Sequence, residues 1–163
     1  MPRPGADAAV TLSVFDRLID ADPRSSSEVP LTRAQSVRTL RDAVRRDLEW
    51  LLNSRQVAFP PSEGLRELNR SVYVYGLPDF TGYNLGSVAA EAKLTKQLQS
   101  ALKFFEPRLA RVRVVPIEPL VAKTRTFRFR IEALLMMDPA PEHISFDTVL
   151  QLTTNQYEVQ NAG

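Results

Sequence analysis

The residues best suited to chemistry or to a specific contact lie at one predicted corner of the chain, in the run Phe105-Glu106-Pro107-Arg108-Leu109. Pro107 fixes its own φ and disfavours helix at the residue before it, so a helix must end near Glu106. In extended chain, residues i and i+2 share a side, so Glu106 and Arg108 are expected to point together. The apolar neighbours predict partial burial of the pair. Two interpretations stay open: the pair braces the corner, or it offers a two-sided polar contact to a partner.

Composition excludes most catalytic constellations. The 163 residues contain no cysteine, which excludes disulfides, zinc-thiolate sites and cysteine nucleophiles. The single histidine, His143, stands at a predicted strand start, where a surface role is expected rather than that of a base. Phosphate-binding glycine loops and the GxSxG elbow are absent. A carboxylate pair for glycosidic cleavage is kept as an alternative; its candidates are Glu106, Glu118, Glu132 and Asp79. We therefore expect no enzyme activity, no cofactor and no metal.

The charge balance is mild, with 21 basic and 19 acidic residues and a net charge of +2. Arginine outnumbers lysine, and its guanidinium suits bidentate pairing with carboxylate or phosphate. A nucleic-acid-binding module is the weaker alternative, because arginines on a sheet face and tyrosines can contact phosphates and stack on bases. The tyrosines in question are Tyr73, Tyr75 and Tyr83.

Two long helices are predicted. Residues 32–54 carry an apolar stripe at spacings of three and four, with Thr32 as N-cap. Trp50 lies beside this stripe and anchors the helix in the core or on a partner, and we favour the core. Residues 87–105 form the second helix, with Ser87 as N-cap.

Strands are predicted after the second helix. Residues 111–115, 124–136 and 144–152 alternate apolar and polar side chains, and residues 72–75 are predicted as a short strand or an extended packed segment. Residues 153–163 fit either a tail or a last edge strand. Fold class is therefore α+β: two main helices on one face of a small, mainly antiparallel sheet, with an N-terminal docking helix.

The chain is divided into three parts. Residues 1–30 are predicted as a flexible N-terminal arm whose short amphipathic helix, within 11–19, docks on its own domain or on a partner. Residues 31–155 form the single α+β domain, and residues 156–163 are assigned to a tail. No run of 18 apolar residues and no secretory signal are visible in the sequence, so a cytoplasmic protein is expected.

Several blocks of the sequence resemble one known family in family order. They are SVFDRLID (13–20), RRDLEWLLNSR (45–55), YGLPDFTG (75–82), FEPRL (105–109) and RFRIEALLMMDPAPEHISFDTVL (128–150). The chain resembles the TssE family, whose members are baseplate subunits of type VI secretion systems. This family is related to the lysozyme-like wedge protein of contractile phage baseplates. The Glu-Pro-Arg triplet of that family matches Glu106, Pro107 and Arg108.

The resemblance implies a structural role without cell-wall hydrolysis. Such subunits join the larger wedge subunits to the first ring of the contractile sheath, at the cytoplasmic face of the inner membrane. The membrane is involved only indirectly, and neither a small-molecule substrate nor nucleic acid is expected. The family also resembles the sheath module in which strands of neighbouring subunits complete one sheet. An exposed strand edge suits that mechanism. Beside the triplet, the expected partner-binding residues are Arg111, Arg113, Arg128 and Arg130.

Overall fold

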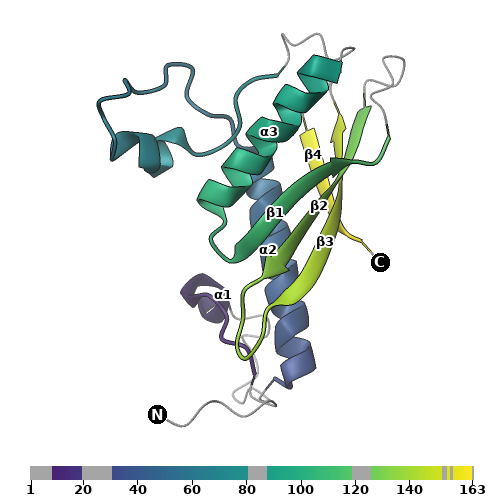
Figure 1. Ribbon diagram of the computed structural model, residues 1–163. Helices are drawn as coiled ribbons and strands as arrows, with labels where there is room; N and C mark the ends of the chain where they lie inside the picture. The colour runs from purple at the N-terminus through teal and green to yellow at the C-terminus, as the bar shows by residue number, and fades with distance from the viewer. Residues whose placement is uncertain are drawn as a thin grey trace.

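The computed structural model describes residues 9–19, 31–80, 88–118, 126–151, 154 and 156–162, which form an α+β structure (Figure 1). Its helices are α1 (Val14–Leu18), α2 (Arg33–Asn53) and α3 (Val88–Phe105), with two short 3-10 helices, η1 (Leu68–Arg70) and η2 (Val72–Val74). Its strands are β1 (Leu109–Pro116), β2 (Thr126–Leu135), β3 (Glu142–Gln151) and β4 (Gln156–Asn161). The predicted fold class is confirmed.

Helix α2 forms because its start and its apolar face are both specified locally. The Thr32 side chain accepts from the backbone N–H of Gln35, and the Gln35 side chain accepts in return from the N–H of Thr32, which makes a capping box. The predicted stripe packs inward, with Leu40, Val44 and Leu48 at most 5% exposed.

The four strands form one sheet in the order β1-β2-β3-β4, and each neighbouring pair is antiparallel. Alternation along β2 buries Phe127, Phe129 and Ile131 and directs Arg128 and Arg130 to the opposite face. Each such buried side chain contributes about 1.5–3 kcal/mol. Helices α2 and α3 both cover the apolar face, and none of the described helices covers the other face, which we call the open face (Figure 1).

Residues 55–80 project from the body beside α3 (Figure 1) and are anchored at both ends. The Leu77 N–H donates to the Ser54 carbonyl, and the Gln56 N–H donates to the Leu77 carbonyl, each at 2.9 Å. Val74, Leu77 and Phe80 are buried in the core. The expected short strand at residues 72–75 is wrong, because Val72–Val74 wind into η2, with Ser71 as its side-chain cap.

Three further predictions are corrected or lie outside the described residues. The tail assigned to residues 156–163 is wrong for Gln156–Asn161, which pair with β3 as β4, so the alternative of a last edge strand is confirmed there. Tyr157 and Val159 are buried, and their polar neighbours hid this alternation in the sequence. Trp50 is not in the core but 54% exposed, because it lies beside the buried stripe of α2 rather than on it. The proposed N-cap Ser87 lies outside the described residues.

Candidate functional site

The Glu-Pro-Arg corner forms a closed acid–base pair where α3 ends and β1 begins. Glu106 is 5% exposed, and the Arg108 side chain folds back on it. Arg108 Nε donates to Glu106 Oε1 at 2.6 Å, and Nη2 donates to Oε2 at 2.5 Å. The prediction that the two side chains point together is confirmed. We call residues 106–108 the elbow.

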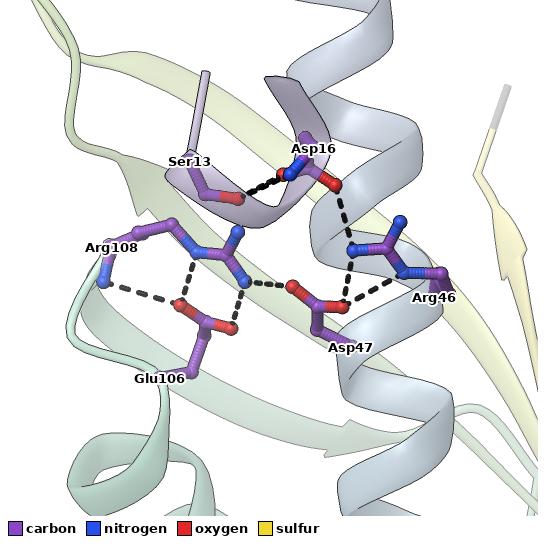
Figure 2. Close-up of polar contacts among 6 residues, drawn as sticks. All are labelled: Ser13, Asp16, Arg46, Asp47, Glu106 and Arg108. Carbon is purple, nitrogen blue, oxygen red and sulfur yellow. Dashed lines mark hydrogen bonds and ion pairs between the residues drawn. The ribbon is translucent and has the colours of Figure 1, made fainter. Parts of the chain in front are cut away.

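The elbow is tied to α2 through Asp47, as Figure 2 shows. Arg108 Nη2 donates to Asp47 Oδ2 at 2.7 Å, and Arg46 donates to Asp47 Oδ1 from Nε at 3.0 Å and from Nη2 at 2.8 Å. One carboxylate therefore accepts from two guanidinium groups. Opposite charges alternate along this chain of contacts, so each charge has a partner of the other sign.

Helix α1 supplies the outer end of the same network (Figure 2). Arg46 Nη2 donates to Asp16 Oδ1 at 2.8 Å, and the Ser13 hydroxyl donates to Asp16 Oδ2 at 2.5 Å. The Arg46 guanidinium also lies 5.4 Å from the ring centre of Phe15 and 5.1 Å from that of Trp50. At such distances a cation is attracted to the ring face. Helix α1 thus docks on α2 of the same chain.

The network shifts the pKa values of its members. The hydrogen bonds to Glu106 raise the pKa of the Arg108 guanidinium, although burial acts the other way. Burial alone would raise the pKa of Asp16, but hydrogen bonds from Ser13 and Arg46 hold it below its usual value. Burial raises the pKa of the nearby Tyr75 phenol, and the charges of Asp47 and Glu106 add to that effect.

The elbow is not wholly buried. The Arg108 side chain retains 26% of its exposure. Arg108 also lines a cavity of about 390 Å³, together with residues 9–13 and the apolar side chains of Leu40 and Met136. Part of the Arg108 side chain therefore remains accessible to a partner.

The geometry of the elbow does not suit hydrolysis. A glycosidase needs one protonated carboxyl group as general acid. Both oxygens of Glu106 and both oxygens of Asp47 are instead occupied by hydrogen bonds from guanidinium groups. Among the described residues, no group of acidic or histidine side chains is placed to hold a metal ion.

The four predicted arginines beyond the elbow fall into two kinds. Arg130 donates to both oxygens of Asp147, at 2.7 and 3.1 Å, and Arg128 lies 4.0 Å from Glu118. Arg111 and Arg113 are exposed on β1 and make no side-chain hydrogen bond or ion pair within the part of the chain that the structure describes. The sequence pattern alone does not separate these two kinds.

Among the described residues, the arginines and tyrosines of the alternative nucleic-acid surface do not lie together. Arg128 and Arg130 lie on the open sheet face beside Asp147, whereas Tyr73 lies in the projecting segment and Tyr75 packs edge-on against Phe105 at 5.2 Å. The third tyrosine, Tyr83, lies outside the described residues.

The two outer strands of the sheet differ in access. At β4, Asn53 of α2 donates to the Tyr157 carbonyl and accepts from the Tyr157 N–H, both at 2.9 Å. Arg45 donates to the Val159 carbonyl at 3.2 Å. Helix α2 therefore occupies main-chain groups along the outer edge of β4.

Beyond its bulge, the outer edge of β1 pairs with no other described strand. The Ile117 N–H donates to the Arg128 carbonyl at 3.0 Å, so alternation turns the main-chain groups of Val115 toward β2 and those of Val114 outward. Of the outward main-chain groups of β1, only the Val112 carbonyl accepts from a side chain among the described residues, that of Gln99 on α3 at 2.8 Å.

Sequence reasoning missed Asp47, Arg46 and Asp16. Asp47 lies 61 residues from Arg108, and Asp16 lies 30 residues from Arg46, so no local spacing pairs them. The one available signal is Ser13 followed three residues later by Asp16, a pattern that predicts a helix start.

Comparison with known proteins defines the class to which this fold and elbow belong. The profile of a family of structural baseplate proteins, described as baseplate wedge protein gp25, matches residues 38–140, which include most of α2, all of α3 and the elbow. The chain belongs to this family, which is also the family of the TssE subunits.

Individual relatives carry another name. The anti-adapter protein IraD of Escherichia coli strain UTI89 is 30% identical over 123 residues, which cover 76% of this chain and 85% of the relative. The IraD protein of strain K12 is 31% identical over 121 residues, which cover 74% and 82%. None of the described helices is long and apolar enough to cross a membrane.

Proposed function

We propose that this protein is a structural baseplate subunit of a type VI secretion system, which joins the wedge complex to the first ring of the contractile sheath. It acts by binding other proteins and transforms no substrate. Its place is the assembled baseplate at the cytoplasmic face of the inner membrane. The observation that carries the proposal is the elbow itself, a Glu-Pro-Arg corner held rigid by Asp47 in a chain of the baseplate wedge family.

The elbow contributes a preorganised donor. Arg108 uses Nε and Nη2 for Glu106 and Asp47, while Nη1 donates to none of the described residues. A guanidinium whose plane is already fixed loses little conformational entropy when a partner accepts its remaining hydrogens.

Strand β1 contributes the second contact. Its outward main-chain groups at Val114 suit the addition of a strand from a sheath subunit. Pro116 has no N–H, which limits how far a partner strand pairs along this edge. The covered edge of β4 makes β1 the edge we assign to this role.

The elbow is tested by Arg108→Ala in co-expression with the two larger wedge subunits and the sheath proteins. The change leaves the nearly buried Glu106 without its partner, at a cost of about 1–3 kcal/mol. A domain with about 5–15 kcal/mol of stability remains folded. We expect recovery of the complex to fall by about tenfold, which corresponds to about 1.4 kcal/mol of binding.

The matched control is Arg41→Ala, which removes an exposed ion pair with Glu142 at 3.3 Å. That variant should assemble as the unchanged protein does. Full assembly of a folded Arg108→Ala protein would remove the elbow from the interface.

The similarity to IraD supports a second candidate. An anti-adapter, as the name states, acts against an adapter protein, so this chain would bind such a protein outside a baseplate. Purification of the protein from cells that express the wedge and sheath subunits distinguishes the baseplate role from the anti-adapter role. Recovery of those subunits supports the baseplate role, and a stable complex with an adapter protein alone supports the other.

A further inference from the structure

A hollow of about 600 Å³ lies where α3 passes the bulge of β1, and three cationic side chains are among its lining residues. Lys103 comes from α3, while Arg111 and Arg113 come from β1, and all three side chains are exposed. We call these residues the bulge cations. The elbow residues do not line this hollow, so it is a separate surface.

The bulge cations are not neutralised internally. None of them makes a side-chain hydrogen bond or ion pair with any residue that the structure describes. Glu132 is the single carboxylate in the lining, and it stands opposite Arg113 in the sheet register without closing an ion pair. By contrast, Arg130 on the neighbouring strand is held by both oxygens of Asp147. Several unpaired cations around one hollow favour a ligand that brings its own negative charges.

Arg111 occupies a backbone conformation that suits glycine better. Its φ is +52°, and the register of β1 against β2 shifts between Ala110 and Arg113, which marks a bulge. The first residue of such a bulge is commonly glycine, because side chains disfavour positive φ. An arginine kept there in spite of the strain points to a use for its side chain.

The hollow lies at the start of the open edge of β1. The Val112 carbonyl is covered by Gln99, and the next outward main-chain groups are those of Val114. A strand added at Val114 places its side chains alternately on the two faces of the sheet. Side chains on the open face then lie near Arg113.

We propose that the bulge cations bind carboxylate side chains of an acidic extended segment in a partner protein, which pairs with β1 beyond the bulge. This proposal rests on the proposed function, since it names the chemistry of the strand that β1 accepts. Carboxylates suit the site because arginine pairs with them in a planar, bidentate manner.

The test is a titration of the full-length, isotope-labelled protein with two capped heptapeptides that alternate Val with either Glu or Lys. The Glu peptide should shift the amide signals of Val114 and Arg113, and the Lys peptide should not. Arg111→Gly and Arg113→Gln should each raise the Kd for the Glu peptide by about fivefold to tenfold at low salt. The control, Arg66→Gln, removes an exposed arginine of the projecting segment and should change the Kd by less than about twofold.

Arg111→Gly also separates binding from folding. Because glycine relieves the positive φ, this variant should melt at a higher temperature and still bind more weakly. A lower melting temperature would contradict the use inferred for the strained arginine. Equal binding of the Glu and Lys peptides would overturn the proposal, as would tighter binding of a single-stranded oligonucleotide, which would indicate a phosphate site. These outcomes are independent of Arg108→Ala, so the hollow and the elbow can fail separately.

Discussion

Arg108 is held by two carboxylates, those of Glu106 and Asp47, yet part of its side chain remains accessible. Glu106 is nearly buried, whereas the Arg108 side chain keeps 26% of its exposure. Removing one partner of such a pair leaves an uncompensated charge, so the pair braces the corner. The same hydrogen bonds fix the guanidinium plane for a further contact. Bracing and partner binding, which the sequence leaves as alternatives, are therefore compatible in one side chain.

At the residue scale, Asp16 makes the docking of α1 sensitive to acid. Its pKa in the folded protein lies below the usual 3.8, so its stabilisation is present above that value and is lost as the pH falls through the lower folded pKa. Trp50 is the only tryptophan, and its ring lies 6.5 Å from that of Phe15, so its fluorescence reports the docking of α1. We expect Asp16→Asn to show at neutral pH the emission that the unchanged protein reaches only below about pH 4.

Asp42→Asn is the control for this prediction. Asp42 also lies on the α2 surface but accepts from Asn161, so the Trp50 emission should stay unchanged at neutral pH. If the emission of Asp16→Asn matches that of the unchanged protein at every pH, Asp16 does not hold α1.

At the scale of elements, the sequence predicts those features of helices and strands that depend on neighbouring residues alone. The α2 stripe, the helix end before Pro107 and the alternation of β2 follow from periodicity and from proline sterics. That Glu106 and Arg108 point to the same side follows from the extended chain after the helix. Asp47 and Asp16 are not predictable in this way, because they join the elbow across long stretches of sequence. The core position expected for Trp50 is wrong because a residue at the border of an apolar stripe packs inward or outward according to its tertiary neighbours.

The projecting segment depends on Gly76, which brings its end against α2. Gly76 has φ +105°, and a Cβ there would lie 2.4 Å from the Ser54 carbonyl oxygen. Gly76→Ala therefore forces the backbone to move, and we expect a loss of about 2–4 kcal/mol. For a protein of this size the melting temperature should fall by roughly 5–15 °C. Thermal denaturation followed by circular dichroism measures the shift.

Gly64→Ala is the matched control in the same segment. No atom lies within 4 Å of a Cβ at Gly64, so its melting temperature should change little. Equal melting temperatures for the two variants would show that the close approach at Gly76 does not anchor the segment.

At the scale of the whole molecule, the sheet has one covered and one open outer strand. An open edge presents unpaired main-chain groups and is a template for association. Helix α2 covers β4 with Asn53 and Arg45, while β1 keeps outward groups at Val114. This difference between the two edges suits a subunit that must pair with a different protein at β1 without pairing with its own copies at β4.

Uncovering β4 should therefore create a second edge and with it self-association. Asn53→Ala frees both the N–H and the carbonyl of Tyr157, at a cost of about 1–3 kcal/mol. We expect light scattering to show dimers or larger species that grow with protein concentration, whereas the unchanged protein stays smaller at the same concentrations. Asn69→Ala is the control, because Asn69 also donates to two backbone carbonyls, those of Ser62 and Leu65, but covers no strand. An Asn53→Ala protein that keeps the mass of the unchanged protein at every concentration would mean that the α2 side chains do not protect the β4 edge.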